Sequence, residues 1–271
     1  IKSIINNKPI LLMTLSQILG SFAVGGSKQD YYIDVLNFAS LGLITGIPGS
    51  IINPFSYMAV PWFRRHFSSR FLYIIGNKID GILLVPVFLV GCIGGKKHGL
   101  YKNIWVMGIA MMLWETIFMI FYGVRRIIPT EMYNEAMDYC EWKNGYRTEG
   151  MTSVAQGLAS KLASIFSRYI SNYIKQLIGY DLTRYVRGTA QTDETKFGLF
   201  AMFTIVPFLT GMISIIPMLF YDLSGKKKEK MYEELLERRA AMSKEATSGD
   251  LEALERLAKA QMEIGNMKQE L

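Results

Sequence analysis

The sequence FGLFAMFTIVPFLTGMISIIPMLFY, residues 197–221, runs for 25 positions without a charged side chain. An α-helix rises about 1.5 Å per residue, so this stretch is long enough to cross the roughly 30 Å hydrocarbon layer of a bilayer. Other long uncharged runs occupy Pro9–Ser27, Val35–Phe63 and Gly81–Gly95. A soluble all-helical protein would instead show amphipathic stripes with regularly spaced charges. The sequence therefore predicts an all-α membrane protein with several spans.

Charged residues divide the chain into two parts. The chain has 271 residues, half of them hydrophobic, and a formal net charge of +7. Residues 225–271 hold ten of the 30 basic and ten of the 23 acidic side chains, so this tail is highly charged yet neutral overall. The whole basic excess therefore lies in the hydrophobic part. We predict a six-helix transmembrane bundle at 1–224 and a charged cytoplasmic amphipathic tail at 225–271.

The tail is predicted to form one or two helices. Leu235, Met242 and Leu251 lie at near-helical spacings between charged residues, and a break is expected at Ser248–Gly249. This pattern is typical of a helix exposed at the membrane surface or in the cytosol. Two interpretations stay open: a solvated anchoring tail, and a tail that binds a partner.

Hydropathy and charge predict six membrane spans in residues 1–224. A glycine-rich patch at Gly20–Gly26 is expected to loosen the first span, and the second carries Pro48, Pro54 and Pro61. Proline is tolerated in membrane helices where neighbouring helices or water satisfy the freed carbonyls, so breaks here suggest a cavity wall. The six predicted spans are Ile10–Val35, Phe38–Phe63, Phe71–Ile93, Asn103–Tyr133, Thr148–Ile178 and Phe197–Asp222.

Basic residues predict the orientation in the membrane. Six crossings place both ends on one side, and Lys and Arg gather after the second, fourth and sixth spans, as in RRHFSSR at 64–70. Because such basic loops face the cytoplasm, we expect both ends there and a multi-pass protein of the cell (inner or plasma) membrane. The chain begins with Ile1 and not Met, which suggests a fragment or a processed half.

The patterns of common enzyme sites are missing from the sequence. Its two histidines, His66 and His98, lie in loops predicted on opposite sides of the membrane. No Cys and His cluster has metal-site spacing, and no glycine-rich loop ends in Gly-Lys-Ser or Gly-Lys-Thr. Basic residues do not alternate with aromatic ones as in a nucleic-acid-binding face. We expect no enzymatic activity, no metal site, no organic cofactor and no nucleic-acid partner.

Lys161 is the most informative charge in the predicted spans, because it lies about thirteen residues into a span of about thirty. A charge at this depth costs a few kcal/mol or more, so it normally faces a bundle interior or an aqueous cavity. A water-lined cavity is the favoured interpretation, and a buried structural ion pair is the alternative. One helical face carries a polar stripe of Gly157, Lys161, Ser164 and Arg168.

Glu115 and Arg168 are a candidate intramembrane ion pair. Glu115 stands alone in the apolar run MMLWETIFM at 111–119, and Arg168 is a charged residue within the fifth predicted span whose role is ambiguous from the sequence. Both a structural pairing between helices and a functional role stay open for Glu115, because intramembrane carboxylates serve either purpose.

The stretch MDYCEWKNGYRTEGMTSVAQGLASK, residues 137–161, resembles the loop and following helix of the glycoside–pentoside–hexuronide:cation symporters. This family is the melibiose-carrier group of the major facilitator superfamily. NKPILLMTLSQILG at 7–20 is similar to its seventh helix, and RRHFSSR at 64–70 to its loop between helices eight and nine. The resemblance rests on an acidic-aromatic cluster, a basic-acidic-glycine turn and a Gln-Lys pair five residues apart.

The resemblance implies the C-terminal half of a twelve-helix major facilitator fold, in which the six spans are helices seven to twelve. It implies secondary active symport of a sugar, glycoside or hexuronide with Na⁺ or H⁺ as the coupling ion. A missing N-terminal six-helix bundle would be the partner and would carry the cation-binding carboxylates. Gln156 and Lys161, with Ser164 on the same helix, would line the substrate cavity. Arg126 falls near an aromatic wall position of the family, and two interpretations of this departure stay open: an anionic substrate such as a hexuronide, or an arginine displaced towards the cytoplasm.

The loop 134–149 is interpreted as a cytoplasmic gate whose ion pairs hold one conformation, with a solvated connector as the alternative. The gate residues implied by the resemblance are Asp138, Tyr139, Glu141, Arg147 and Glu149.

Two rival functions stay open. A carrier of the same fold could move lipids or lysolipids, with one lysine for a phosphate in an apolar cavity. A membrane scaffold or sensor could instead act through the charged tail.

Overall fold

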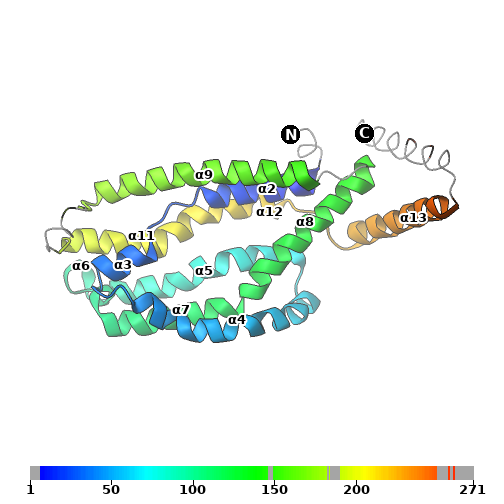
Figure 1. Cartoon of the computed structure of the whole chain (residues 1–271). Coiled ribbons are helices and arrows are strands. Elements are labelled where there is room, and N and C mark those ends of the chain that lie inside the picture. Colours follow the sequence, from blue (N-terminus) through cyan, green and yellow to red (C-terminus); the bar gives the residue numbers. More distant parts are fainter. Residues whose placement is uncertain are drawn as a thin grey trace.

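The computed structural model describes residues 7–145, 149–181, 183, 190–248, 256 and 259. Across these residues the chain is helical and contains no β-strand, which agrees with the predicted all-α class. Most of the long helices run along one common axis, while α8 crosses it obliquely (Figure 1). The helices are α2 (Lys8–Ser21), α3 (Lys28–Asp34), α4 (Leu41–His66), α5 (Ser69–Cys92), α6 (Gly95–His98), η1 (Leu100–Lys102), α7 (Ile104–Ile120), α8 (Tyr122–Asn144), α9 (Glu149–Leu177), α11 (Asp193–Gly211), η2 (Met212–Ile215), α12 (Ile216–Leu219) and α13 (Lys226–Ser248).

The helices form two layers. In Figure 1, α9, α2 and the α11–α12 segment lie along one side, and α5, α7 and α4 lie along the other. Within the layers α2 packs on α9 and α4 packs on α7, while α5 and α11 join the two layers. We call the two ends of this bundle the α13 end and the α6 end.

Each end of the bundle has its own packed cluster of apolar side chains. The cluster at the α13 end includes Ile10, Met132 and Tyr221, and the one at the α6 end includes Tyr101 and Phe200. The rings of Tyr101 and Phe200 are stacked with their centroids 5.4 Å apart. More polar side chains lie between the two clusters, in the middle of the bundle. The central site described below is formed by them.

The first predicted span is broken in the structure. Residues 22–27 are not helical, and α3 begins after them with the Ser27 hydroxyl accepting a hydrogen bond from the Gln29 amide. Two glycines allow this segment to lie against α11: a Cβ at Gly25 would be 2.6 Å from Cγ of Pro207, and one at Gly26 would be 3.1 Å from Cβ of Met202. The glycine-rich patch therefore predicted the break correctly.

The second predicted span is not broken, which corrects the expectation from its prolines. α4 continues through Pro48, Pro54 and Pro61 as one helix of 26 residues. Proline removes one backbone hydrogen bond and crowds the preceding turn, but it does not force the helix to end when neighbouring helices hold it. α4 is held in this way by α7 and α8.

The fourth span is longer than predicted. α7 ends at Ile120 and α8 continues from Tyr122 to Asn144, where Gly145 caps it with a left-handed backbone at φ 78°. The loop predicted at 134–149 is therefore helical as far as Asn144. The sequence was misleading because residues 131–144 are rich in charge, and a helix that leaves the apolar layer keeps its backbone bonds while its side chains become polar.

Within the part of the chain that the structure describes, three helical segments are long and apolar enough to cross a membrane: Ser69–Cys92, Ile104–Asn144 and Asp193–Leu219. The first of the other expected spans is divided between α2 and α3. The Gly, Pro and Asn residues of α4 lower the mean hydropathy of the second. The helix of the fifth, α9, carries Lys161 and Arg168. The count of six spans stays a prediction.

The first part of the tail is packed against the bundle. Met231 and Leu235 of α13 are 0% and 1% exposed and belong to the apolar cluster at the α13 end. This differs from the expected solvated tail, because one face of α13 covers the end of α8. The tail beyond Ser248 lies outside the described residues, apart from 256 and 259.

Candidate functional site

Two adjoining hollows open in the middle of the bundle between α2, α5 and α8. They measure about 250 and 500 Å³ and share four lining residues. We call the two together the central cavity. The shared residues are Gln17, Tyr73, Asn77 and Arg125.

Neutral polar groups of the cavity come from α2 and α5. Gln17 is exposed to the hollow, and its side-chain amide makes no hydrogen bond to the described part of the chain. The Asn77 amide nitrogen donates to the Tyr73 carbonyl at 3.0 Å, one turn earlier on α5. Because an amide carries both donors and acceptors, Gln17 and Asn77 suit a ligand rich in hydroxyl groups.

Cations line the same cavity. A Cβ at Gly76 would be 3.2 Å from Cα of Arg125, so this glycine lets α8 approach α5 closely and sets the position of Arg125. One Arg125 nitrogen lies 4.0 Å from a carboxylate oxygen of Asp80, beyond hydrogen-bonding distance. The Lys78 ammonium donates to the Gly211 carbonyl at 2.5 Å. Arg125 and Lys78 therefore keep unused donors beside the hollow, because both can make several hydrogen bonds.

Two of the predicted substrate-binding residues line this cavity. Gln156 is buried and donates from Nε2 to the Thr14 hydroxyl at 2.5 Å, which ties α9 to α2. Arg126 is exposed and donates from Nε to the Tyr122 hydroxyl at 3.0 Å. Their contact with a substrate stays a prediction.

The other two lie on a different face. Lys161 is exposed on α9, and its ammonium has no ion-pair or hydrogen-bond partner in the part of the chain that the structure describes. The Ser164 hydroxyl is turned to its own helix and donates to the Lys161 carbonyl at 2.8 Å. Neither lines the central cavity in this arrangement, so their predicted roles depend on what covers α9.

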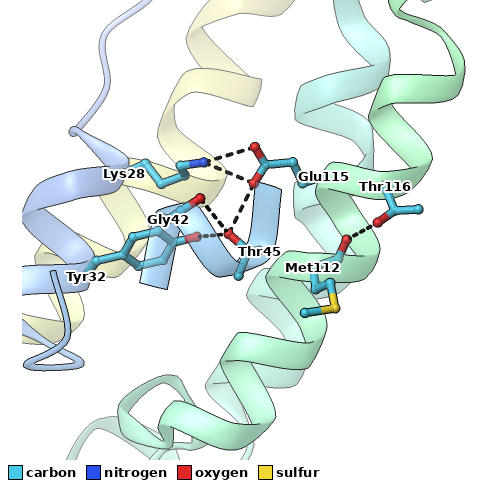
Figure 2. Close-up of polar contacts among 7 residues, drawn as sticks. All are labelled: Lys28, Tyr32, Gly42, Thr45, Met112, Glu115 and Thr116. Atoms are coloured by element: carbon cyan, nitrogen blue, oxygen red, sulfur yellow. Dashed lines mark hydrogen bonds and ion pairs between the residues drawn. The ribbon is translucent and has the colours of Figure 1, made fainter. Parts of the chain in front are cut away.

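Glu115 is paired, but with Lys28 and not with Arg168. The Lys28 ammonium lies 3.1 and 3.3 Å from the two carboxylate oxygens, and the Thr45 hydroxyl donates to one of them at 3.2 Å (Figure 2). Lys28 also lies over the rings of Tyr32 and Trp114. The sequence could not show this pair because the two residues are 87 positions apart. It joins α3, α4 and α7 at the α6 end.

The predicted gate residues on α8 are bound by the tail helix. Arg239 donates to Glu141 at 2.5 and 3.0 Å and to Asp138 at 2.9 Å, and the hydrogen bond to Glu141 raises its pKa. The Tyr232 hydroxyl also contacts Asp138 at 3.4 Å, and burial raises the pKa of Tyr232 to about 12. Tyr139 is buried in the apolar cluster. A gate role for these residues stays a prediction.

Two predicted gate residues cannot be placed. Arg147 lies outside the described residues, and so does the side chain of Glu149, whose backbone begins α9. Three acidic side chains near the end of α8, Glu135, Asp138 and Glu141, form ion pairs with α13. Lys228 of that helix pairs with Glu135 at 2.5 Å, and Glu234 accepts a hydrogen bond from the Trp142 indole at 2.6 Å.

Sequence reasoning missed the neutral part of the central cavity. Gln17 and Asn77 are single polar residues in long apolar runs, and such residues are common in membrane helices as packing contacts between helices. Lys78 and Arg125 were visible as charges, but both lie near predicted span ends, where a cation commonly snorkels to the interface. Only the packing of α2, α5 and α8 brings the four together.

A comparison with known families decides the class of the protein. The profile of a family described as MFS/sugar transport protein matches residues 1–225. The chain belongs to this family. The match covers all the predicted spans and confirms the resemblance to symporters of the major facilitator superfamily.

Relatives at low identity carry similar descriptions. A putative sulfoquinovose importer of Escherichia coli K12 is 25% identical over 253 residues, which cover 88% of this chain and 48% of the relative. A glucuronide carrier protein homolog of the same organism is 22% identical over 84% of this chain and 47% of the relative. The uncharacterized symporter YjmB of Bacillus subtilis is 24% identical over 87% and 48%.

The chain spans about half the length of the curated relatives that it matches. Family membership and the apolar helices make it a multi-pass membrane protein of a sugar-transport family. The relatives are transporters and not enzymes, in line with the lack of enzyme motifs in the sequence.

Proposed function

We propose that this chain is the C-terminal half of a secondary active transporter that moves an anionic sugar together with Na⁺ or H⁺. The other half, a second six-helix bundle, would close the central cavity from its open side. The central cavity would then alternate between the two sides of the membrane as the halves rock about it. The α13 end would face the cytoplasm, in keeping with the basic residues near it.

The composition of the central cavity is the observation that carries this proposal. Sugar hydroxyls need donors and acceptors together, and Gln17 and Asn77 provide both. Apolar sugar faces need ring or methylene surfaces, and Tyr73 lines both hollows. A lipid carrier would be expected to present a mainly apolar wall, so these polar groups favour a sugar over a lipid.

Charge supports an anionic sugar over a neutral one. Arg125, Arg126 and Lys78 line the central cavity, and the Asp80 carboxylate is near only the first of them, at 4.0 Å. A guanidinium with free N–H groups binds a carboxylate or sulfonate through charge-assisted hydrogen bonds, which are about twice as strong as neutral ones. The descriptions of two relatives, an importer of sulfoquinovose and a glucuronide carrier homolog, are consistent with this charge.

The coupling ion would bind mainly in the other half. Among the described residues no three His, Cys, Asp or Glu side chains lie close enough to hold a metal ion. Two intramembrane carboxylates, Glu115 and Asp80, have cationic neighbours, and the first is already occupied by Lys28. The resemblance to the symporter family implies cation-binding carboxylates in the other half, so we propose that this half mainly binds the sugar.

Uptake by proteoliposomes tests the proposal. The full-length transporter is expected to accumulate labelled glucuronate when a Na⁺ or H⁺ gradient is imposed, and the 271-residue chain alone is expected to accumulate none. Arg125→Gln should raise the KM for glucuronate about tenfold to a hundredfold, since a hydrogen bond to a charged group contributes about 1.5–3 kcal/mol. Lys97→Gln, at an exposed position away from the cavity, is the matched control.

Three outcomes would contradict the proposal. Uptake by the chain alone would show that no second half is needed. Equal transport of a neutral sugar by wild type and Arg125→Gln, with no transport of glucuronate by either, would exclude an anionic substrate. Displacement of bound fluorescent lysolipid, without any sugar uptake, would favour a lipid carrier.

A further inference from the structure

A second polar hollow lies where α2 and α3 are separated. It measures about 440 Å³ and lies between the non-helical segment 22–27 and the α9 face that carries Ser167, Arg168 and Asn172. We call it the α2–α3 cavity. None of its lining residues belongs to the central cavity, so the two hollows are distinct.

The wall of the α2–α3 cavity is held in place by hydroxyl groups. The Ser167 hydroxyl donates to the Ala23 carbonyl at 2.6 Å, and the Ser171 hydroxyl accepts from the Gly25 amide at 3.2 Å. Both serines are less than 10% exposed. Unpaired backbone at membrane depth is costly, and irregular backbone is tolerated where it is buried in protein or lines a cavity. Here it does both.

One cation at this cavity has no counter-charge. Lys175 is paired with Asp30 of α3, so these two charges cancel. Arg168 is exposed on α9, and its guanidinium has no hydrogen-bond or ion-pair partner in the part of the chain that the structure describes. The α2–α3 cavity therefore carries an uncompensated positive charge with five free N–H donors.

The two cavities are separated along α9. Gln156 lines the central cavity and Arg168 lines the α2–α3 cavity, twelve residues further on. Twelve residues correspond to about 18 Å along an α-helix. Lys161 lies between them and is exposed on the same helix, seven residues before Arg168 and therefore on the same side of it. Lys161 therefore shares the side of α9 that carries Arg168, and it does not line the central cavity.

We propose that the α2–α3 cavity is a second binding site for the anionic group of the transported sugar, with Arg168 as its anchor and Asn172 as a hydrogen-bonding neighbour. This inference rests on the proposed function, because it assigns the site to the same cargo. The second site lies toward the α6 end of the bundle. Cargo that enters from that side would therefore meet Arg168 before Arg125, and cargo that leaves to that side would meet Arg168 after Arg125. A carboxylate or sulfonate matches the guanidinium geometry.

A snorkelling arginine is the simpler explanation of Arg168 alone. It lies nine residues, or about 14 Å, before the end of α9 at Leu177, and an arginine can cover part of such a distance with its apolar stem. Snorkelling does not account for the polar hollow beside it, for the two buried serines that shape the hollow, or for the neutralisation of the neighbouring Lys175. A lipid phosphate has the same chemistry as a sugar anion, so the experiment must distinguish the two.

Equilibrium dialysis with radiolabelled glucuronate tests the number of sites directly. The full-length transporter in nanodiscs of phosphatidylcholine is expected to bind two glucuronates, and Arg168→Gln to bind one. Arg125→Gln should also bind one, while the double variant should bind none and Lys97→Gln should still bind two. A stoichiometry of one for wild type, or no change in Arg168→Gln, would overturn the second site while leaving the first intact.

Transport from each side of the membrane provides the functional measurement. Arg168→Gln should raise the KM for glucuronate about tenfold when glucuronate is supplied from the α6 side, and should leave it unchanged from the α13 side. Arg168→Lys should recover part of the loss. An equal effect from both sides, or on a neutral sugar as well, would contradict an anion site. Absence of any sugar transport by wild type would defeat the proposed function itself.

The lipid source is tested by changing the bilayer. Phosphatidylglycerol replacing half of the phosphatidylcholine should leave both glucuronate sites intact. Loss of the Arg168-dependent site alone in these nanodiscs would assign it to a lipid headgroup and overturn the sugar assignment.

Discussion

The layer that contains α4 and α7, together with the crossing helix α8, differs from the single helix α9 in how closely it is packed and in how its charges are paired. In the layer, Gly123 lies against the backbone of Ser56, and a Cβ there would be 2.6 Å from its carbonyl oxygen. On α9, a Cβ at Gly157 would meet nothing within 4 Å. The charges differ in the same way: Glu115 forms an ion pair with Lys28, whereas Lys161 has no partner within the described ranges of the chain.

This difference separates structural from functional charges. A charge that leaves water is tolerated inside a protein when a partner compensates it, and Glu115 has both Lys28 and Thr45. Lys161 and Arg168 have no such partner among the described residues, so the structure of this chain alone gives no reason for their presence. Under the proposed function, they would face either the cargo or the second half of the transporter.

The largest expected effect comes from breaking the close contact in the layer. Gly123→Ala should lower the free energy of unfolding by about 3 kcal/mol, because the methyl group meets the backbone of α4, which cannot rotate away. Gly157→Ala is the matched control on α9 and should raise it by up to about 1 kcal/mol through helix propensity. Chemical unfolding in detergent followed by circular dichroism measures both. Equal effects would show that α9 is packed as tightly as the layer.

Removing one partner of the buried pair should have a smaller effect. Glu115→Ala leaves Lys28 uncompensated and should destabilise the chain by about 2 kcal/mol, less than a fully buried pair because Lys28 is 30% exposed. The double variant Lys28→Met, Glu115→Leu should recover most of this loss. A double variant no more stable than Glu115→Ala would mean that the pair has no part in the effect.

The ion pairs between α13 and α8 are expected to contribute still less to the free energy of unfolding. Arg239→Gln removes hydrogen bonds to Asp138 and Glu141 and should cost about 1 kcal/mol, since the arginine is 43% exposed and solvent screens it. Hydrogen exchange should rise in α13, while the apolar contacts of Met231 and Leu235 keep it docked. Unchanged protection of the α13 amides from exchange in this variant would show that Arg239 does not help to hold α13 on α8.

The smallest effect on stability is expected on α9. Lys161→Ala should change the free energy of unfolding by less than about 0.5 kcal/mol, because the side chain is exposed and makes no described contact. If Lys161 lies on the path of an anionic sugar, uptake by the full-length transporter should nevertheless fall about tenfold. A destabilised Lys161→Ala would place this residue with the structural charges.

Much of the fold could be predicted from the sequence. Uncharged runs located the apolar helices to within a few residues, and the glycines at 20–26 predicted the break between α2 and α3. Helicity of residues 134–144 was missed, because loss of hydropathy is not loss of helix. The three prolines of α4 were misleading, because the helices that pack against α4 and allow it to continue are distant in sequence.

The candidate site was predictable only in part. Gln156 and Arg126, both named through the resemblance to a family, line the central cavity, and their contact with a substrate stays a prediction. Gln17 and Asn77 carry no local signal, and the partner of Glu115 lies 87 positions away. Such long-range pairings depend on how helices pack, which a single sequence does not encode visibly.

The three prolines give α4 a mechanical property. Each proline lacks the N–H that would have bonded to the carbonyl four residues earlier. The carbonyls of Ile44, Ser50 and Tyr57 therefore have no i→i+4 backbone hydrogen bond. Bending at those levels therefore ruptures no backbone bond, whereas bending α7 would rupture several. Helices α5, α8 and α11 carry one internal proline each, so α4, with three, has the largest number of such positions among the described helices.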